Sequence, residues 1–130
     1  MERVILVVDD EPVVRSFVSN ACKTRGLRPL VADDGQQGYE LFLQLRDQIS
    51  LVLTDVSMPR LSGPQLVRRI RAERPGTPIL LMTGYSPTMV IPTDVFDCPM
   101  LRKPFTVETL MTAIDTAMRS RDGSSSAYAD

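Results

Sequence analysis

Runs of aliphatic and β-branched residues recur along the chain without the polar alternation of a half-exposed strand. Continuous apolar runs of this kind are typical of strands covered on both faces, as in a parallel sheet. The second and fifth runs are shorter and interrupted by proline, so they are weaker candidates. The pattern predicts five strands, at 3–8, 28–32, 50–54, 77–83 and 98–101.

Between these runs the apolar positions return at helical spacing. The pattern predicts helices at 12–25, at 35–47, from Pro64 onward and after Thr106. The apolar stripe of the first helix includes Phe17, which we expect to face the sheet. Asp33 or Asp34 is available to cap the second helix, and Thr106 to cap the last.

Strands that alternate with helices at this spacing imply right-handed crossovers and a doubly wound α/β fold. We expect a three-layer, flavodoxin-like sandwich with a five-stranded parallel sheet in the order 2-1-3-4-5. Prolines in 85–97 leave room for at most a short, irregular fourth helix. We expect one domain over 1–119, followed at 120–130 by a Ser/Gly-rich disordered tail or linker.

Composition narrows the possible functions. The 130 residues carry a net charge of about −1, which gives no general attraction to nucleic acid or to anionic membranes. The chain has no histidine, so Ser-His-Asp and Cys-His catalysis are excluded and no phosphohistidine can form on it. Cys22 and Cys98 lack C-x-x-C spacing and read as free, buried thiols of a reducing compartment. No signal peptide or membrane span is evident, and we expect a cytoplasmic protein.

Polar residues gather where the predicted strands end. Asp9 and Asp10 follow the first strand, Asp55 the third, Thr83 ends the fourth and Lys103 follows the fifth. In doubly wound sheets, ligands bind outside the carboxyl ends of the strands. Three carboxylates, a hydroxyl and an ammonium are therefore expected to share one small volume.

Three neighbouring carboxylates repel one another unless a cation joins them. Oxygen ligands with room for water suit Mg²⁺. A carboxylate beside Mg²⁺, with Lys103 facing it, is arranged to accept a phosphoryl group. Asp55 is the best candidate nucleophile, because it stands alone at a strand end while Asp9 and Asp10 share the metal.

Simpler interpretations exist for each feature taken alone. Asp9 and Asp10 could form a solvated turn or a helix cap. Lys103 by itself would read as a surface lysine. The arginine-rich stretch 67–74 suggests nucleic-acid binding, but no aromatics interleave with it, and a solvated helix face is the better interpretation.

Four motifs, each closing a predicted strand, resemble the receiver domain of two-component response regulators. They are VVDDE at 7–11, LVLTDVSMPRLSG at 51–63, LLMTGY at 80–85 and LRKPF at 101–105. The resemblance covers about residues 2–118. In detail it is closest to receivers attached to hybrid histidine kinases and to stand-alone receivers.

The resemblance implies a role for each acidic residue. Asp55 would be the phosphoacceptor, and Asp10 a direct Mg²⁺ ligand. Asp9 would bind the ion mostly through water, and the backbone carbonyl of Ser57 would be a further ligand.

It also implies a switching apparatus. Thr83 would move to hydrogen-bond the phosphoryl oxygen, Lys103 would pair with the phosphoryl group, and Pro104 would follow a peptide bond that is often cis. Gly84 would leave the phosphoryl group open to attack. Met100 stands where receivers usually carry an aromatic residue that turns inward, so the usual aromatic switch is missing.

The expected function is that of a phosphorylated switch rather than of an enzyme. A sensor histidine kinase or a histidine phosphotransfer protein would donate to Asp55, and an unknown protein would read a surface formed by the fifth strand and last helix. A homodimer through that surface is one arrangement. The alternatives are a Mg²⁺-dependent aspartyl-phosphate phosphatase or phosphotransferase, which usually has a second acid where Ser57 stands, and a degenerate receiver that only binds partners.

Overall fold

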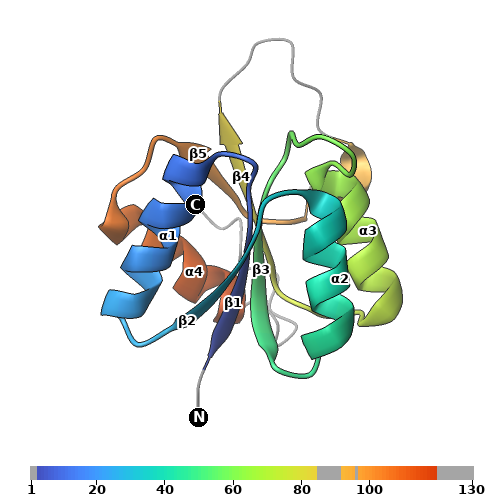
Figure 1. Ribbon diagram of the computed structural model, residues 1–130, viewed down its shortest axis with the longest axis horizontal. Helices are drawn as coiled ribbons and strands as arrows, with labels where there is room; N and C mark the ends of the chain where they lie inside the picture. The colour runs from blue at the N-terminus through green and yellow to red at the C-terminus, as the bar shows by residue number, and fades with distance from the viewer. Residues whose placement is uncertain (1–2, 85–91, 96, 120–130) are drawn as a thin grey trace.

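The strands form a single parallel sheet with helices on both faces. The computed structural model describes residues 3–84, 92–95 and 97–119 (Figure 1). The strand order is β2-β1-β3-β4-β5, and every neighbouring pair is parallel, which confirms the predicted fold class. The strands are β1 Val4–Val8, β2 Arg28–Ala32, β3 Ile49–Asp55, β4 Ile79–Gly84 and β5 Met100–Lys103.

The helices divide into two pairs, one on each face of the sheet (Figure 1). Successive residues of a strand point to opposite faces. Ile5 of β1 therefore packs with the helices α1 and α4, whereas Leu6 packs with α2 and α3 on the other face. This double coverage explains why the strands are apolar throughout. The helices are α1 Pro12–Thr24 and α4 Val107–Arg119 on one face, and α2 Gly35–Leu45 and α3 Gly63–Glu73 on the other.

Side-chain caps fix where three of the helices begin. The Asp34 carboxylate accepts a hydrogen bond from the Gln37 N–H at 2.8 Å, so Asp34 rather than Asp33 caps α2. Ser62 and Gln65 form a reciprocal capping box on α3. The predicted cap Thr106 accepts a hydrogen bond from the N–H of Thr109 at 3.1 Å.

Several predicted boundaries are shifted by one or two residues, among them the start of β4, predicted at 77 and found at Ile79, and one predicted side-chain orientation was wrong. β5 begins two residues later than predicted, at Met100, because Pro99 contributes only its carbonyl, which accepts a hydrogen bond from the Leu81 N–H at 2.9 Å. Phe17 does not face the sheet: it is 38% exposed and packs sideways on Phe105, with ring centroids 5.9 Å apart.

The region between β4 and β5 is only partly described. The predicted irregularity falls largely on 85–91 and 96, which lie outside the described residues. Of the rest, Thr93–Val95 forms a short 3₁₀ helix, η1. The proposed tail, 120–130, also lies outside. None of the helices that the structure describes is long and apolar enough to span a membrane.

Arginines of α3 hold the segment before β5. Arg68 makes a bidentate ion pair with Asp94, with distances of 2.6 and 3.0 Å, and Arg71 lies 2.6 Å from Asp97. The expectation of a merely solvated helix face was therefore incomplete, because two of its arginines join α3 to the segment around η1.

Candidate functional site

Parallel register brings the ends of three strands to one edge of the sheet. Asp9 directly follows β1, Asp55 is the last residue of β3, and Lys103 is the last residue of β5. Val8 pairs with Thr54, the residue before Asp55, and β4 bridges β3 and β5. The strand ends therefore converge, although the three residues are far apart in sequence.

The Lys103 ammonium is the centre of this cluster. Its Nζ lies 2.9 Å from Oδ2 of Asp9, 2.9 Å from Oε1 of Glu11 and 3.4 Å from Oδ2 of Asp55. The lysine side chain is only 15% exposed. One ammonium thus balances three carboxylates, which leaves the cluster with a net negative charge.

Asp9 is the most enclosed of the acids. Its residue is fully buried, and Oδ1 accepts a hydrogen bond from the Glu11 N–H at 2.8 Å. Its Oδ2 lies 2.9 Å from the Lys103 ammonium and has no other partner among the described residues. A buried carboxylate oxygen with open lone pairs is poised to bind a cation.

Asp55 is held at the end of the central strand. Its Oδ1 accepts a hydrogen bond from the N–H of Val56 at 2.9 Å, which leaves Oδ2 directed toward Lys103. Burial, followed by the charge of Asp9, raises the pKa of Asp55 to about 6, while Lys103 and the Val56 N–H oppose the rise. An ionised Asp55 is therefore costly in the absence of further positive charge.

Lys103 stays charged despite its partial burial. Burial alone would lower its pKa, but the contacts with Glu11 and Asp9, together with the charge of Asp55, raise that pKa above the ordinary lysine value. The peptide bond between Lys103 and Pro104 is cis.

The structure places the other predicted site residues less centrally. Asp10 and Ser57 are exposed, and Asp10 does not belong to the group of three acids whose oxygens lie close together. Thr83 is nearly buried, and its hydroxyl donates to the Gly84 carbonyl at 3.1 Å. Glu11 was not predicted as a site residue. Its place directly after Asp9 and Asp10 was the one indication in the sequence. The sequence does not show where a side chain beyond the end of the strand points.

Gly63 packs against the backbone of Asp55 and Val56. A Cβ built there would overlap the backbone oxygen of Asp55 and would lie 2.9 Å from Cα of Val56. The Gly63 N–H also donates to the Val56 carbonyl at 2.9 Å. The first residue of α3 is therefore packed directly on the backbone at the end of β3.

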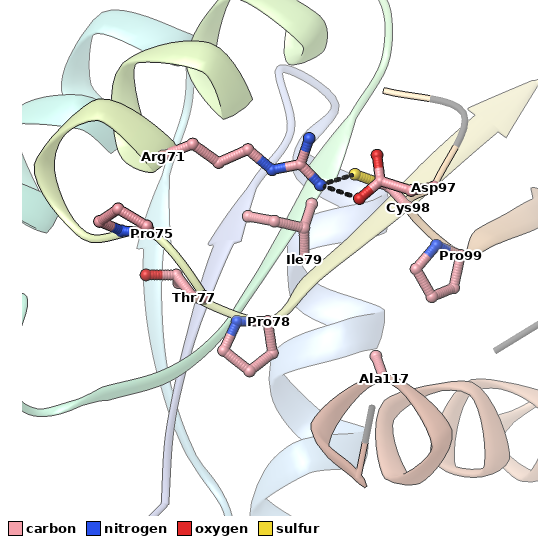
Figure 2. A pocket seen from close by; sticks show the side chains of 10 residues that line it. Arg71, Pro75, Thr77, Pro78, Ile79, Asp97, Cys98, Pro99 and Ala117 are labelled. Carbon is pink, nitrogen blue, oxygen red and sulfur yellow. Dashed lines mark hydrogen bonds and ion pairs between the residues drawn. The ribbon is translucent and has the colours of Figure 1, made fainter. Parts of the chain in front are cut away.

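A cavity of about 350 Å³ lies at the opposite end of β4 (Figure 2). Arg71 on its wall is paired with Asp97 and with Cys98, whose Sγ accepts at 3.2 Å. Prolines and Ala117 supply much of the remaining lining. This cavity is separate from the carboxylate cluster and has no carboxylate left unpaired.

The donor set fits a hard divalent cation. One oxygen each from Asp9, Glu11 and Asp55 lies within 4.8 Å of the others. Carboxylate oxygens are the ligands that Mg²⁺ prefers. Together with the open lone pairs on Asp9, these oxygens make a site that Mg²⁺ could enter.

Comparisons with known proteins identify the family of this chain. The family described as response regulator receiver domain matches residues 5–115. The receiver protein CpdR of Brucella abortus is 31% identical over 117 residues, which cover 88% of this chain and 95% of CpdR. A receiver domain structure from Clostridium thermocellum superimposes with a TM-score of 0.78 at 27% identity, covering 92% of this chain and 97% of that one.

Other relatives are longer proteins. Sensor kinase CckA of Brucella abortus is 29% identical over 121 residues, which make up 91% of this chain but 13% of CckA. The chain spans 31% and 49% of two further curated relatives. The match to the family over most of the chain settles the class: this chain belongs to the response regulator receiver domain family of two-component signalling.

Proposed function

We propose that Asp55 accepts a phosphoryl group from a phosphohistidine of a partner protein in a Mg²⁺-dependent reaction. The observation that carries this proposal is that Asp9 and Asp55 both lie beside the Lys103 ammonium at the carboxyl edge of the sheet. Such a constellation offers a nucleophile and, beside it, a cation for the charge of the transferred group.

Asp9, Asp10, Asp55 and the carbonyl of Ser57 are the residues proposed to hold Mg²⁺. The ion, when bound, would neutralise charge that develops on the phosphoryl oxygens. The buried Oδ2 of Asp9 supports this proposal, because its one polar partner among the described residues is the Lys103 ammonium. The side chain of Asp10 is exposed and does not lie close to the other acids. Its proposed role is supported by the family motif alone.

In the proposed transfer, an oxygen of Asp55 attacks phosphorus in line with the phosphorus–nitrogen bond of the donor. The oxygen–phosphorus bond forms as the nitrogen–phosphorus bond breaks, and the electron pair returns to the imidazole, which leaves neutral because its other nitrogen carries a proton. Lys103 attracts the equatorial oxygens throughout. Water later attacks the phosphorus and returns Asp55 as a carboxylate with inorganic phosphate.

The phosphorylated state is proposed to be read through protein contact. Thr83 would turn its hydroxyl from the Gly84 carbonyl toward the phosphoryl group. Met100, at the start of β5, is 40% exposed and offers no aromatic ring for the usual switch. We propose that β5 and α4 form the output surface, alone or in a homodimer, and that transfer is stoichiometric with slow self-hydrolysis.

The donor class follows from the family and from the chain's lack of histidine. We propose a sensor histidine kinase or a histidine phosphotransfer protein as partner, in a phosphorelay. Similarity to a sensor kinase and to a receiver protein of one organism supports this assignment. Free, buried Cys22 and Cys98 support a reducing compartment and hence the cytoplasm. Residues 1–119 are proposed to be the receiver and 120–130 a tail.

The test is intact-mass measurement after incubation with acetyl phosphate. The wild type should gain one phosphoryl group with Mg²⁺ and none with EDTA, and Asp55→Ala should gain none in either case. Asp47→Asn, which removes an exposed carboxylate between α2 and β3, is the matched control and should be modified like the wild type. Modification of Asp55→Ala would move the acceptor elsewhere.

A further inference from the structure

Glu11 lies in the carboxylate cluster with Asp9 and Asp55, but it is not among the residues proposed to hold Mg²⁺, and helix capping does not explain its position. It occupies the N-cap position of α1, but its side chain makes no capping hydrogen bond. Glutamate is also not among the residues favoured at that position. Its carboxylate instead reaches across to β5, where it accepts a hydrogen bond from the Lys103 ammonium at 2.9 Å.

Glu11 and Asp55 draw on the same ammonium. The contact from Nζ to Glu11 is 2.9 Å, whereas that to Asp55 is 3.4 Å. The Glu11 side chain is 60% exposed and that of Asp55 only 9%, so the lysine is drawn toward the mouth of the site. The backbone N–H of Glu11 at the same time donates a hydrogen bond to Oδ1 of Asp9.

We propose that Glu11 is a positioning residue that holds the Lys103 ammonium away from the acceptor and so weakens its grip on a phosphoryl group there. This inference rests on the proposed function, because it assigns Glu11 a part in that same site. A phosphoryl dianion on Asp55 competes with the Glu11 carboxylate for one cation. Removal of the Glu11 contact therefore favours the phosphorylated state.

Two substitutions separate contact from charge. Glu11→Gln keeps the shape but removes the charge. Glu11→Asp keeps the charge but shortens the side chain by about 1.5 Å, one carbon–carbon bond, so the contact with Lys103 is lost. Asp47→Asn, in the exposed turn between α2 and β3, is the control for loss of one negative charge elsewhere.

The experiment titrates beryllofluoride, a phosphoryl mimic, into each protein at saturating Mg²⁺ and follows bound fluoride by ¹⁹F NMR. Glu11→Gln and Glu11→Asp should both bind about two- to fivefold more tightly than the wild type, the range expected for an exposed ion pair. Asp47→Asn should bind like the wild type. Circular dichroism verifies that each variant is folded.

The outcomes distinguish the two proposals. Wild-type-like or weaker binding by Glu11→Gln overturns the role of Glu11 while leaving the phosphoacceptor proposal intact. Tighter binding by Glu11→Gln but not by Glu11→Asp means that net charge acts and contact does not, which also overturns it. A folded wild type that binds no beryllofluoride contradicts the proposed function itself.

Discussion

Replacement of Asp55 by asparagine should stabilise the metal-free protein at neutral pH. The amide is neutral, as the protonated carboxyl would be, and its Oδ1 can still accept the hydrogen bond from the Val56 N–H. The substitution therefore removes the cost of an ionised group in a buried cluster without creating a cavity. Lys103 keeps its contacts with Asp9 and Glu11.

The magnitude follows from the pKa of Asp55. That pKa rises from 3.8 to about 6 in the folded protein, and each pH unit corresponds to about 1.4 kcal/mol. A carboxyl group with a raised folded pKa contributes no penalty below pH 4, where both states are protonated. Between pH 4 and 6 the unfolded chain ionises first, so the free energy of unfolding falls. Above pH 6 the full penalty, up to about 3 kcal/mol, remains.

The assay is urea denaturation of wild type and Asp55→Asn in EDTA at several values between pH 4 and 8. The variant should be more stable by about 1–3 kcal/mol at pH 8, and the two proteins should converge near pH 4. The difference between them isolates Asp55 from other titrating groups. With Mg²⁺ the difference in stability between the two proteins should shrink or change sign. A ligand at 100 times its Kd adds about 2.7 kcal/mol to the free energy of unfolding of a protein that binds it.

Two results would refute this reasoning. Equal stability of both proteins across the pH range in EDTA would mean that Asp55 is not desolvated in the folded state. A Mg²⁺-induced gain as large in Asp55→Asn as in the wild type would mean that this carboxylate does not contribute to the metal site.

Three further predictions concern glycine packing, the ion pairs of Lys103 and the burial of the two cysteines. Gly63→Ala should destabilise the fold by about 2–4 kcal/mol in urea denaturation, because the added Cβ overlaps the Asp55 backbone. Gly84→Ala, with open space around the added Cβ, should change the stability little. Equal effects of the two substitutions would contradict the packing argument. Lys103→Met should cost about 2–4 kcal/mol in EDTA, because a buried carboxylate loses its counter-ion; unchanged stability would show the ion pairs to be unimportant. Burial raises the pKa of both Cys22 and Cys98 to about 11 from 9.0, so their alkylation at pH 8 should be about 100-fold slower than in the urea-unfolded chain, and comparable rates would contradict their burial.

The fold could be predicted because it follows from two features of the sequence, the pattern of apolar residues and the positions where the strands end. Continuous apolar runs required helices on both faces, and parallel strands brought Asp9, Asp55 and Lys103 to one edge. These side chains belong to strand ends or lie next to them, where backbone direction is fixed by hydrogen bonding. Their convergence therefore followed from topology alone.

Other features depend on side-chain direction outside the strands. Glu11 lies in the turn between β1 and α1, and nothing in the sequence fixes its reach toward Lys103. The pairing of Arg68 with Asp94 depends on how the segment before β5 crosses α3. Phe17 satisfied the helical period, but the packing of α1 on the sheet left it at the edge, against Phe105.

The central claim is that Asp55 is the residue that carries the phosphoryl group. Aspartyl phosphate is reduced by borohydride to homoserine, so the modified residue can be located by peptide mass spectrometry after treatment with acetyl phosphate and Mg²⁺. We predict homoserine at position 55 in the wild type and at no position after omission of the donor. Homoserine at position 9 or 10, with position 55 unchanged, would contradict the account.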